Sequence, residues 1–158
     1  MKIVLDTNVL LSGLLTSFGP SGEIVRMVSA GKLILYIDAR ILSEYHEVLQ
    51  RPKFKFNNDH IDTLISFIKH NGQFVSALPL KSPLPDPDDE AFLEVAIAGN
   101  VRYLITGNIV HYPSSHREGI NILSPSKFLE YYRKENEGTE IKNDNNAHDQ
   151  ENYVPHKP

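Results

Sequence analysis

Short apolar runs alternate along this chain with longer segments in which apolar residues recur every three or four positions. The short runs are typical of buried β-strands, and the longer segments are typical of amphipathic helices. Five strands are predicted, at Lys2–Leu5, Lys32–Ile37, Gln73–Ala77, Tyr103–Thr106 and Ile120–Leu123. A short helix is predicted to begin at Asn8. Longer helices are predicted at Ser21–Ala30, Ala39–Gln50, Asn58–His70, Asp88–Ala98 and about Ser126–Lys134.

This order of elements predicts an α/β fold, with three layers (α/β/α) around a central parallel sheet of four to five strands. Strands that are buried on both faces have continuous apolar sequences, as these do. Right-handed crossovers bring the carboxyl ends of all the strands to one edge of the sheet. Open sheets of this kind bind ligands at that edge.

Acidic side chains reach that edge from three separate segments. Asp6 directly follows the first strand, and Glu44 lies in the early turns of the helix after the second strand, at the border of its apolar stripe. The segment Asp86–Glu90 opens the helix that precedes the fourth strand. Helical spacing places Asp89 on the inward face of that helix, with Asp88 as the second choice.

Asn108 follows the fourth strand, so three carboxylates and one amide are predicted to meet at the same edge. Carboxylates that are packed together raise one another's pKa values. A divalent cation such as Mg²⁺ removes this repulsion, because it takes carboxylate oxygens while keeping several waters. It also activates water and stabilises charge on a phosphoryl oxygen. Glu47 and Glu94 are predicted to point away from this place.

The net charge of −4 arises mainly at the end of the chain. Of 20 acidic and 16 basic residues, five acidic and two basic ones lie from Glu137 onward. That stretch has few large apolar residues, so we expect one domain over residues 1–136 and a flexible polar tail over residues 137–158. The remaining charge is nearly balanced, which does not indicate nucleic-acid binding by bulk charge.

The composition excludes several kinds of chemistry and of location. The chain has no cysteine, which excludes disulfides and thiol nucleophiles. No apolar segment has the length of a membrane-spanning helix, and the first apolar run ends at Asp6, too early for a signal peptide. We therefore expect a cytoplasmic protein without a membrane partner.

Each acidic residue also has a purely structural interpretation. Asp6 could cap the short helix that follows it, and Glu44 could be an acid favoured by the helix dipole. Asp86 could cap a helix that begins at Pro87, and Asn108 could be a turn residue. Capping does not predict that all of them fall at one edge, and this favours a shared site.

Two further motifs are ambiguous. "HYPSSH" places His111 and His116 in a loop at a spacing that no metal motif requires, so both are predicted to lie at the surface. "RPKFKF" alternates basic and aromatic residues, so Arg51 and Lys53 could contact a nucleic-acid strand through charge and stacking. The alternative is a helix stop followed by half-buried phenylalanines.

Four stretches resemble the PIN-domain family: "IVLDTNVLLSGLL", "ARILSEYHEVLQRPKF", "DPDDEAFLEVAIAGNVRYLITGN" and "GINILSPSKFLEYY". They span about residues 1–134, and the likeness is closest to toxins of prokaryotic toxin–antitoxin modules. The resemblance implies a small nuclease that cleaves RNA with Mg²⁺ or Mn²⁺, by in-line attack of a water that leaves a 5′-phosphate. It also implies a small antitoxin protein as partner, and such domains often form homodimers.

Matching the motifs implies that Asp6, Glu44 and Asp89 are the catalytic acids. The metal ligands that the resemblance implies are Asp6, Glu44, Asp88, Asp89 and Asn108. Many family members have an acid where this chain has Asn108, and a further acid where it has Val110. The contacts expected to substrate or water come from Asn8, Ser12, Arg51 and Lys53.

Two other functions stay open at this point. The uncharged Asn108 is compatible with a catalytically weakened PIN-fold module that binds RNA or protein. A phosphohydrolase of another α/β fold could use Asp6 as a nucleophile. That chemistry usually needs a second Asp two residues further on, where this chain has Asn8.

Overall fold

The computed structural model describes the backbone of residues 1–150 and the side chains of residues 1–137. In this range the strands are β1 (Lys2–Leu5), β2 (Ile34–Ile37), β3 (Gln73–Phe74), β4 (Tyr103–Ile105) and β5 (Asn121–Leu123). The α-helices are α1 (Thr7–Leu15), α2 (Pro20–Ser29), α3 (Ala39–Leu49), α4 (Asn58–Asn71), α5 (Glu90–Ala98) and α6 (Pro125–Gln150). Short 3₁₀ turns are η1 (Pro52–Phe54), η2 (Pro87–Asp89), η3 (Ile109–His111) and η4 (Ser114–His116).

The five strands form one parallel sheet in the order β3-β2-β1-β4-β5. β1 is central, with Ile3 opposite Leu35 of β2 on one side and Tyr103 of β4 on the other. The chain first builds outward from β1 through β2 to β3, and then returns to add β4 on the other side of β1. The direction of winding therefore reverses between β1 and β4, and ligands of open α/β sheets bind at such a switch point.

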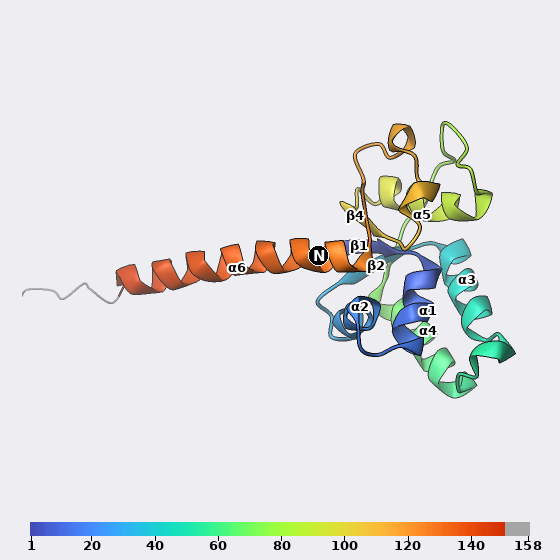
Figure 1. Ribbon diagram of the computed structural model, residues 1–158, viewed down its shortest axis with the longest axis horizontal. Coiled ribbons are helices and arrows are strands. Elements are labelled where there is room, and N and C mark those ends of the chain that lie inside the picture. Colours follow the sequence, from blue (N-terminus) through green and yellow to red (C-terminus); the bar gives the residue numbers. More distant parts are fainter. Residues whose placement is uncertain (151–158) are drawn as a thin grey trace, which may run out of the picture.

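Helices cover both faces of the sheet, which confirms the predicted three-layer α/β fold. α5 contacts β1, β2 and β4. Figure 1 shows α5 on the opposite side of the sheet from α1, α2 and α4. The inner strand residues Ile3, Leu5 and Leu104 have no exposed surface, and neither have Leu93 and Ala96 of α5. Burial on both faces explains the nearly continuous apolar strand sequences.

The ends of β3 and α6 differ most from the sequence prediction, and other elements differ by one or two residues. β3 pairs with β2 only over Gln73–Phe74, whereas the prediction extended it to Ala77. Val75 still donates to the carbonyl of Ile37 at 3.0 Å. Beyond it the proline-rich chain leaves the sheet edge.

The last helix was predicted to end near Lys134, but α6 continues to Gln150. The apolar pattern on which the predicted end was based stops before these later turns. The expected division into a domain over residues 1–136 and a flexible tail over residues 137–158 stays a prediction, and residues 151–158 lie outside the described residues. Within the described chain, none of the helices has both the length and the apolar character needed to cross a bilayer.

Candidate active site at the carboxyl edge of the sheet

A cavity of about 390 Å³ opens at the carboxyl ends of β1 and β4, beside the switch point. Its charged lining consists of five carboxylates, two cations and one imidazole. These are Asp6, Glu44, Asp86, Asp88, Asp89, Arg51, Lys53 and His111. Asn8 and Asn108 also line the cavity, whereas Ser12 does not and lies exposed on α1. The structure thus gathers every residue of the predicted site except Ser12 around one cavity.

Asp6 is the most deeply buried of these carboxylates, with 4 % of its surface exposed. Its backbone N–H donates to the carbonyl of Ile105 at 3.0 Å, and Thr106 Oγ1 donates to Asp6 Oδ2 at 2.6 Å. Asp6 is the N-cap residue of α1. Burial raises the pKa of Asp6, and the hydrogen bond from Thr106 and the backbone N–H groups of Asn8 and Thr7 oppose this effect only in part.

Glu44 is half-buried on α3 and faces the same cavity. Thr7, the first residue of α1, donates its hydroxyl to Glu44 Oε2. Burial raises the pKa of Glu44, and the charges of Asp6, Asp88 and Asp89 raise it further. Three acidic segments that are far apart in the sequence therefore interact electrostatically, as the shared-edge argument predicted.

The turn η2 presents the third acidic group. Asp86 caps this turn by accepting from the Asp88 N–H at 3.0 Å, as its structural interpretation predicted. Asp89 is 9 % exposed, whereas Asp88 remains exposed at the cavity wall, which agrees with the choice of Asp89 as the inward carboxylate. Burial raises the pKa of Asp89, and so do the charges of Asp6 and Asp86.

His111 is a site residue that the sequence interpretation missed. It was predicted to lie at the surface, but its Nδ1 is 3.0 Å from Asp89 Oδ2 and its side chain lines the cavity. Ligand atoms of Asp86, Asp89 and His111 all lie within 4.8 Å of one another. Among the described side chains this is the group close enough to share an ion, and Asp6 and Glu44 stand outside it. A loop histidine has no periodicity that could reveal such a contact.

Tyr112 follows His111 and is fully buried, and its hydroxyl has no hydrogen-bond partner in the described structure. Burial raises its pKa far above the ordinary value, and the charges of Asp6, Asp89, Glu44 and Asp86 add to this rise. The hydroxyl therefore lies within the electrostatic range of four carboxylates of the cavity. A buried unpaired donor beside acids indicates a place for a further polar group.

Basic and amide side chains line the rest of the cavity. Arg51 pairs with Glu47 through two hydrogen bonds of 3.0 and 3.2 Å, and Lys53 lies 5.0 Å above the ring of Phe54. Asn108 is half-buried, and its backbone N–H donates to Thr106 Oγ1 at 3.0 Å. This contact ties the Asn108 turn to the hydroxyl that holds Asp6.

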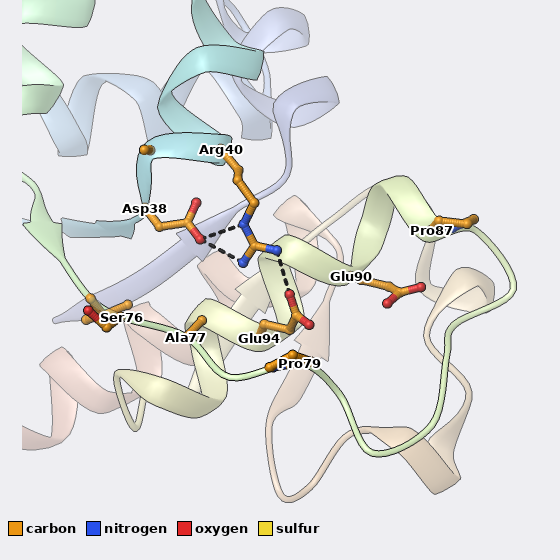
Figure 2. Close-up of a pocket in the computed structure, with 10 residues that line it drawn as sticks. Asp38, Arg40, Ser76, Ala77, Pro79, Pro87, Glu90 and Glu94 are labelled. Carbon is orange, nitrogen blue, oxygen red and sulfur yellow. Dashed lines mark hydrogen bonds and ion pairs between the residues drawn. The ribbon is translucent and has the colours of Figure 1, made fainter.

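A second, more open cavity of about 680 Å³ lies beside the first, along the segment that leads to η2. Figure 2 shows Arg40 between two acids: Asp38 Oδ2 at 2.7 Å and Glu94 Oε1 at 2.7 Å. Glu94 also accepts from the backbone N–H of Leu80 at 2.9 Å. Glu94 points away from the first cavity, as predicted, but it is buried and paired. It joins α3, α5 and the loop before η2.

The chemistry of the lining fits a hard divalent cation. Burial raises the pKa values of Asp6, Glu44 and Asp89, and neighbouring carboxylates raise those of Glu44 and Asp89 further, so positive charge among them is favourable. Their oxygens, with the amide of Asn108, are the ligand type that Mg²⁺ and Mn²⁺ prefer. Neighbouring threonines fix the orientation of two of these carboxylates, as outer hydrogen bonds do in metal sites.

Comparison with known proteins agrees with this geometry. The sequence model of the family described as "PIN domain" matches residues 2–110, which include Asp6, Glu44, Asp89 and Asn108. An uncharacterised protein of Methanocaldococcus jannaschii is 23% identical over 144 residues, covering 85% of this chain and 93% of its own length. The family model matches more than half of the chain, and the sheet, its helical layers and the acidic cavity are as the sequence resemblance implied. The chain therefore belongs to the PIN-domain family.

Proposed function

We propose that this protein is a metal-dependent endoribonuclease that hydrolyses RNA phosphodiester bonds and acts as the toxin of a toxin–antitoxin pair. PIN domains are generally metal-dependent nucleases and often serve as such toxins. The observation that carries the proposal is the cavity in which carboxylates from three distant segments meet beside two cationic side chains.

In this proposal the carboxylates of Asp6, Glu44 and Asp89 draw together around a Mg²⁺ or Mn²⁺ ion, because without an ion they are not all within the 4.8 Å that joins Asp86, Asp89 and His111. Asp88 and Asn108 lie at the margin of this ion. When bound, such an ion lowers the pKa of a water and offsets charge on the phosphoryl group. The protein contributes orientation: Thr106 holds the Asp6 carboxylate, and Thr7 holds Glu44. Pre-orientation of this kind reduces the rearrangement needed when substrate binds.

The RNA strand is expected to enter along η1. Arg51 and Lys53 are exposed there and would pair with backbone phosphates. The ring of Phe54 lines the same wall and offers a stacking surface for a base. The amide of Asn8 is exposed on the cavity wall and would bind water or a phosphate oxygen. Ser12 has no part in this proposal, because it lies outside the cavity.

The direct test is cleavage of a labelled single-stranded RNA by the purified protein with Mg²⁺ or Mn²⁺, and with EDTA. We expect cleavage that EDTA abolishes and that Asp6→Asn reduces by on the order of 100-fold. Glu130→Gln is the matched control, since it removes an exposed carboxylate of α6 that pairs only with Lys127 among the described contacts. Equal cleavage by the parent and Asp6→Asn would refute the assigned role.

A catalytically weakened binding module is the second candidate, and Asn108 favours it. This residue lines the cavity but supplies no charge. Titration calorimetry with Mn²⁺ distinguishes the two functions: no binding at millimolar metal, together with retained RNA binding, would favour the module. Membership of the PIN family argues against the phosphohydrolase of another fold with Asp6 as nucleophile.

The partners complete the proposal: RNA as substrate, a small antitoxin protein, and a second copy of the chain in a homodimer. A cytoplasmic location likewise stays a prediction. Growth arrest on expression of the protein, relieved by co-expression of a neighbouring small reading frame, would support the toxin role. Normal growth during expression of a protein that is active in vitro would contradict it.

A further inference from the structure

We propose that Asp86, Asp89 and His111 form a second divalent-cation site that prefers Mn²⁺ or another transition-metal ion over Mg²⁺. The inference deepens the proposed function and rests on it, because Asp89 would stand between this ion and the one at Asp6 and Glu44. The sequence prediction contained neither Asp86 nor His111 as a ligand. His111 also lies one residue beyond the range that matches the family.

The ligand geometry is close to what one ion requires. One atom from each of the three residues lies within 4.8 Å of the other two. His111 Nδ1 and Asp89 Oδ2 are 3.0 Å apart. Two adjacent ligands of an octahedral ion, each at ~2.1 Å from the metal, are separated by about 3 Å. Without an ion this contact is a hydrogen bond. An ion would replace it by taking both atoms as neighbouring ligands, and a movement of Asp86 towards them would complete the set.

Two short turns hold these residues in place. In η2, Asp86 Oδ1 accepts from the Asp88 N–H at 3.0 Å, and the Asp86 carbonyl accepts from the Asp89 N–H at 3.2 Å. In η3, the His111 N–H donates to the Asn108 carbonyl at 3.0 Å. The ligands are therefore supported by hydrogen-bonded backbone on both sides.

Tyr112, which follows His111 in the sequence, provides a second observation. Its hydroxyl is fully buried and has no partner among the described residues, although hydroxyls in protein interiors are almost always hydrogen-bonded. The carboxylates of Asp89 and Asp86 are among those whose charges act on it. A water carried by an ion in this cluster would supply the missing acceptor.

The imidazole determines which ion is preferred. Mg²⁺ takes oxygen ligands and keeps its waters, whereas imidazole nitrogen suits transition metals. With two carboxylates and one imidazole, the group of Asp86, Asp89 and His111 therefore favours Mn²⁺ or another transition-metal ion.

Manganese binding by the full-length protein tests this site without relying on activity. We expect titration followed by electron paramagnetic resonance to give two Mn²⁺ per chain. Pulsed electron paramagnetic resonance should detect a ¹⁴N nucleus that is directly coupled to one of the two Mn²⁺ ions. His111→Gln should lose that coupling and one Mn²⁺. Asp6→Asn should keep the coupled ion. The matched control His116→Gln, on η4 of the same loop, should keep both ions.

The outcomes separate this inference from the proposed nuclease. A single Mn²⁺ without nitrogen coupling in the parent protein, or coupling that survives in His111→Gln, would overturn the second site. A nitrogen-coupled ion in a protein that cuts no RNA would support the second site and overturn the nuclease proposal. If added Mg²⁺ displaced the nitrogen-coupled Mn²⁺ before it displaced the other Mn²⁺, the proposed preference of this site for Mn²⁺ over Mg²⁺ would be contradicted.

Discussion

At the scale of single residues, Asp6 shows most clearly how function and stability oppose each other. It is buried at the switch point, and burial raises its pKa. The hydrogen bond from Thr106 is suited to a charged or an amide oxygen alike. A carboxylate at this place is thus tolerated by the fold and is favourable only when positive charge is nearby.

We expect Asp6→Asn to stabilise the metal-free protein while it strongly reduces the proposed cleavage. Removal of a buried charge among like charges should raise the free energy of unfolding by on the order of 1 kcal/mol. Urea unfolding in EDTA measures this, with Glu130→Gln as the control. Equal or lower stability of Asp6→Asn would show that repulsion in the cavity is weak.

The pH dependence of stability follows from the same raised pKa values. In Asp6, Glu44 and Asp89 the folded-state pKa lies above the unfolded value, so the folded state binds protons more readily. Their contribution to stability is therefore fully present below the unfolded pKa values and is lost as pH rises through the folded ones.

We expect the difference in unfolding free energy between the parent and Asp6→Asn, measured in EDTA, to shrink as pH falls from 7 towards 4. Saturating Mg²⁺ should reverse the sign of the difference at pH 7, because the ion stabilises only the charged site. A difference that is constant across this range would contradict the raised pKa of Asp6.

Tyr112 supports a separate prediction. Its unpaired hydroxyl is buried, and Phe has the same shape without the polar group. Tyr112→Phe should therefore raise the unfolding free energy of the metal-free protein by about 1 kcal/mol. Thermal unfolding in EDTA measures this. If a bound ion provides the partner, Mn²⁺ should stabilise the parent more than it stabilises the variant.

The sequence predicts individual site residues where they follow a regular pattern. Asp89 was placed inward by helical spacing, and Asp6 by its position after a buried strand. Both expectations agree with their burial. His111 lies in a loop, where neither spacing nor strand order says which way a side chain points. Its contact with Asp89 depends on how two loops meet in space.

At the scale of elements, the buried acid Glu94 joins three segments. Through Arg40 and the Leu80 N–H it holds the loop before η2 against α3 and α5 (Figure 2). That loop leads to Asp86 and Asp89. Glu94 thus supports the acidic turn without touching the cavity that the turn lines.

Glu94→Ala should destabilise the protein by about 2 kcal/mol, because it leaves the Leu80 N–H without its partner and Arg40 without one of its two acids. This loss of stability is smaller than the loss expected for a fully buried ion pair, because the side chain of Arg40 is 53% exposed. Glu94→Gln keeps an acceptor and should cost about half as much. Urea unfolding of both variants gives the comparison, and equal losses would mean that the hydrogen bonds contribute little.

Element positions were predictable because each strand is apolar and each helix has a periodic face. The ends were less predictable. The end of β3 depends on where the proline-rich loop leaves the edge, and β3 itself is exposed. The end of α6 was predicted too early because the apolar pattern on which the prediction was based stops before its later turns.

At the scale of the whole molecule, α6 belongs to the domain only through its first part. Phe128 is fully buried, with its ring 5.7 Å from that of Tyr103, and Arg133 pairs with Glu23 at 2.8 Å. Figure 1 shows the later turns extending away from the sheet and its helices. The described anchoring contacts therefore come from the beginning of the helix.

We expect a chain that ends at Glu137 to keep the fold and the site. Its thermal midpoint should differ from that of the full chain by less than about 3 °C, because no described core residue is removed. Calorimetry and Mn²⁺ binding provide the measurements. A large drop in either would show that the later turns of α6 contribute to the domain.

The parallel order of the sheet also governs when the site can exist during synthesis. Asp6 and Glu44 leave the ribosome early, but Thr106, which holds Asp6, follows about a hundred residues later, and His111 later still. A nascent chain that stops short of β4 lacks the β1–β4 strand pair and the Asn108 and His111 wall of the cavity. Under the proposed nuclease function, an unfinished copy would therefore leave the messenger that encodes it intact.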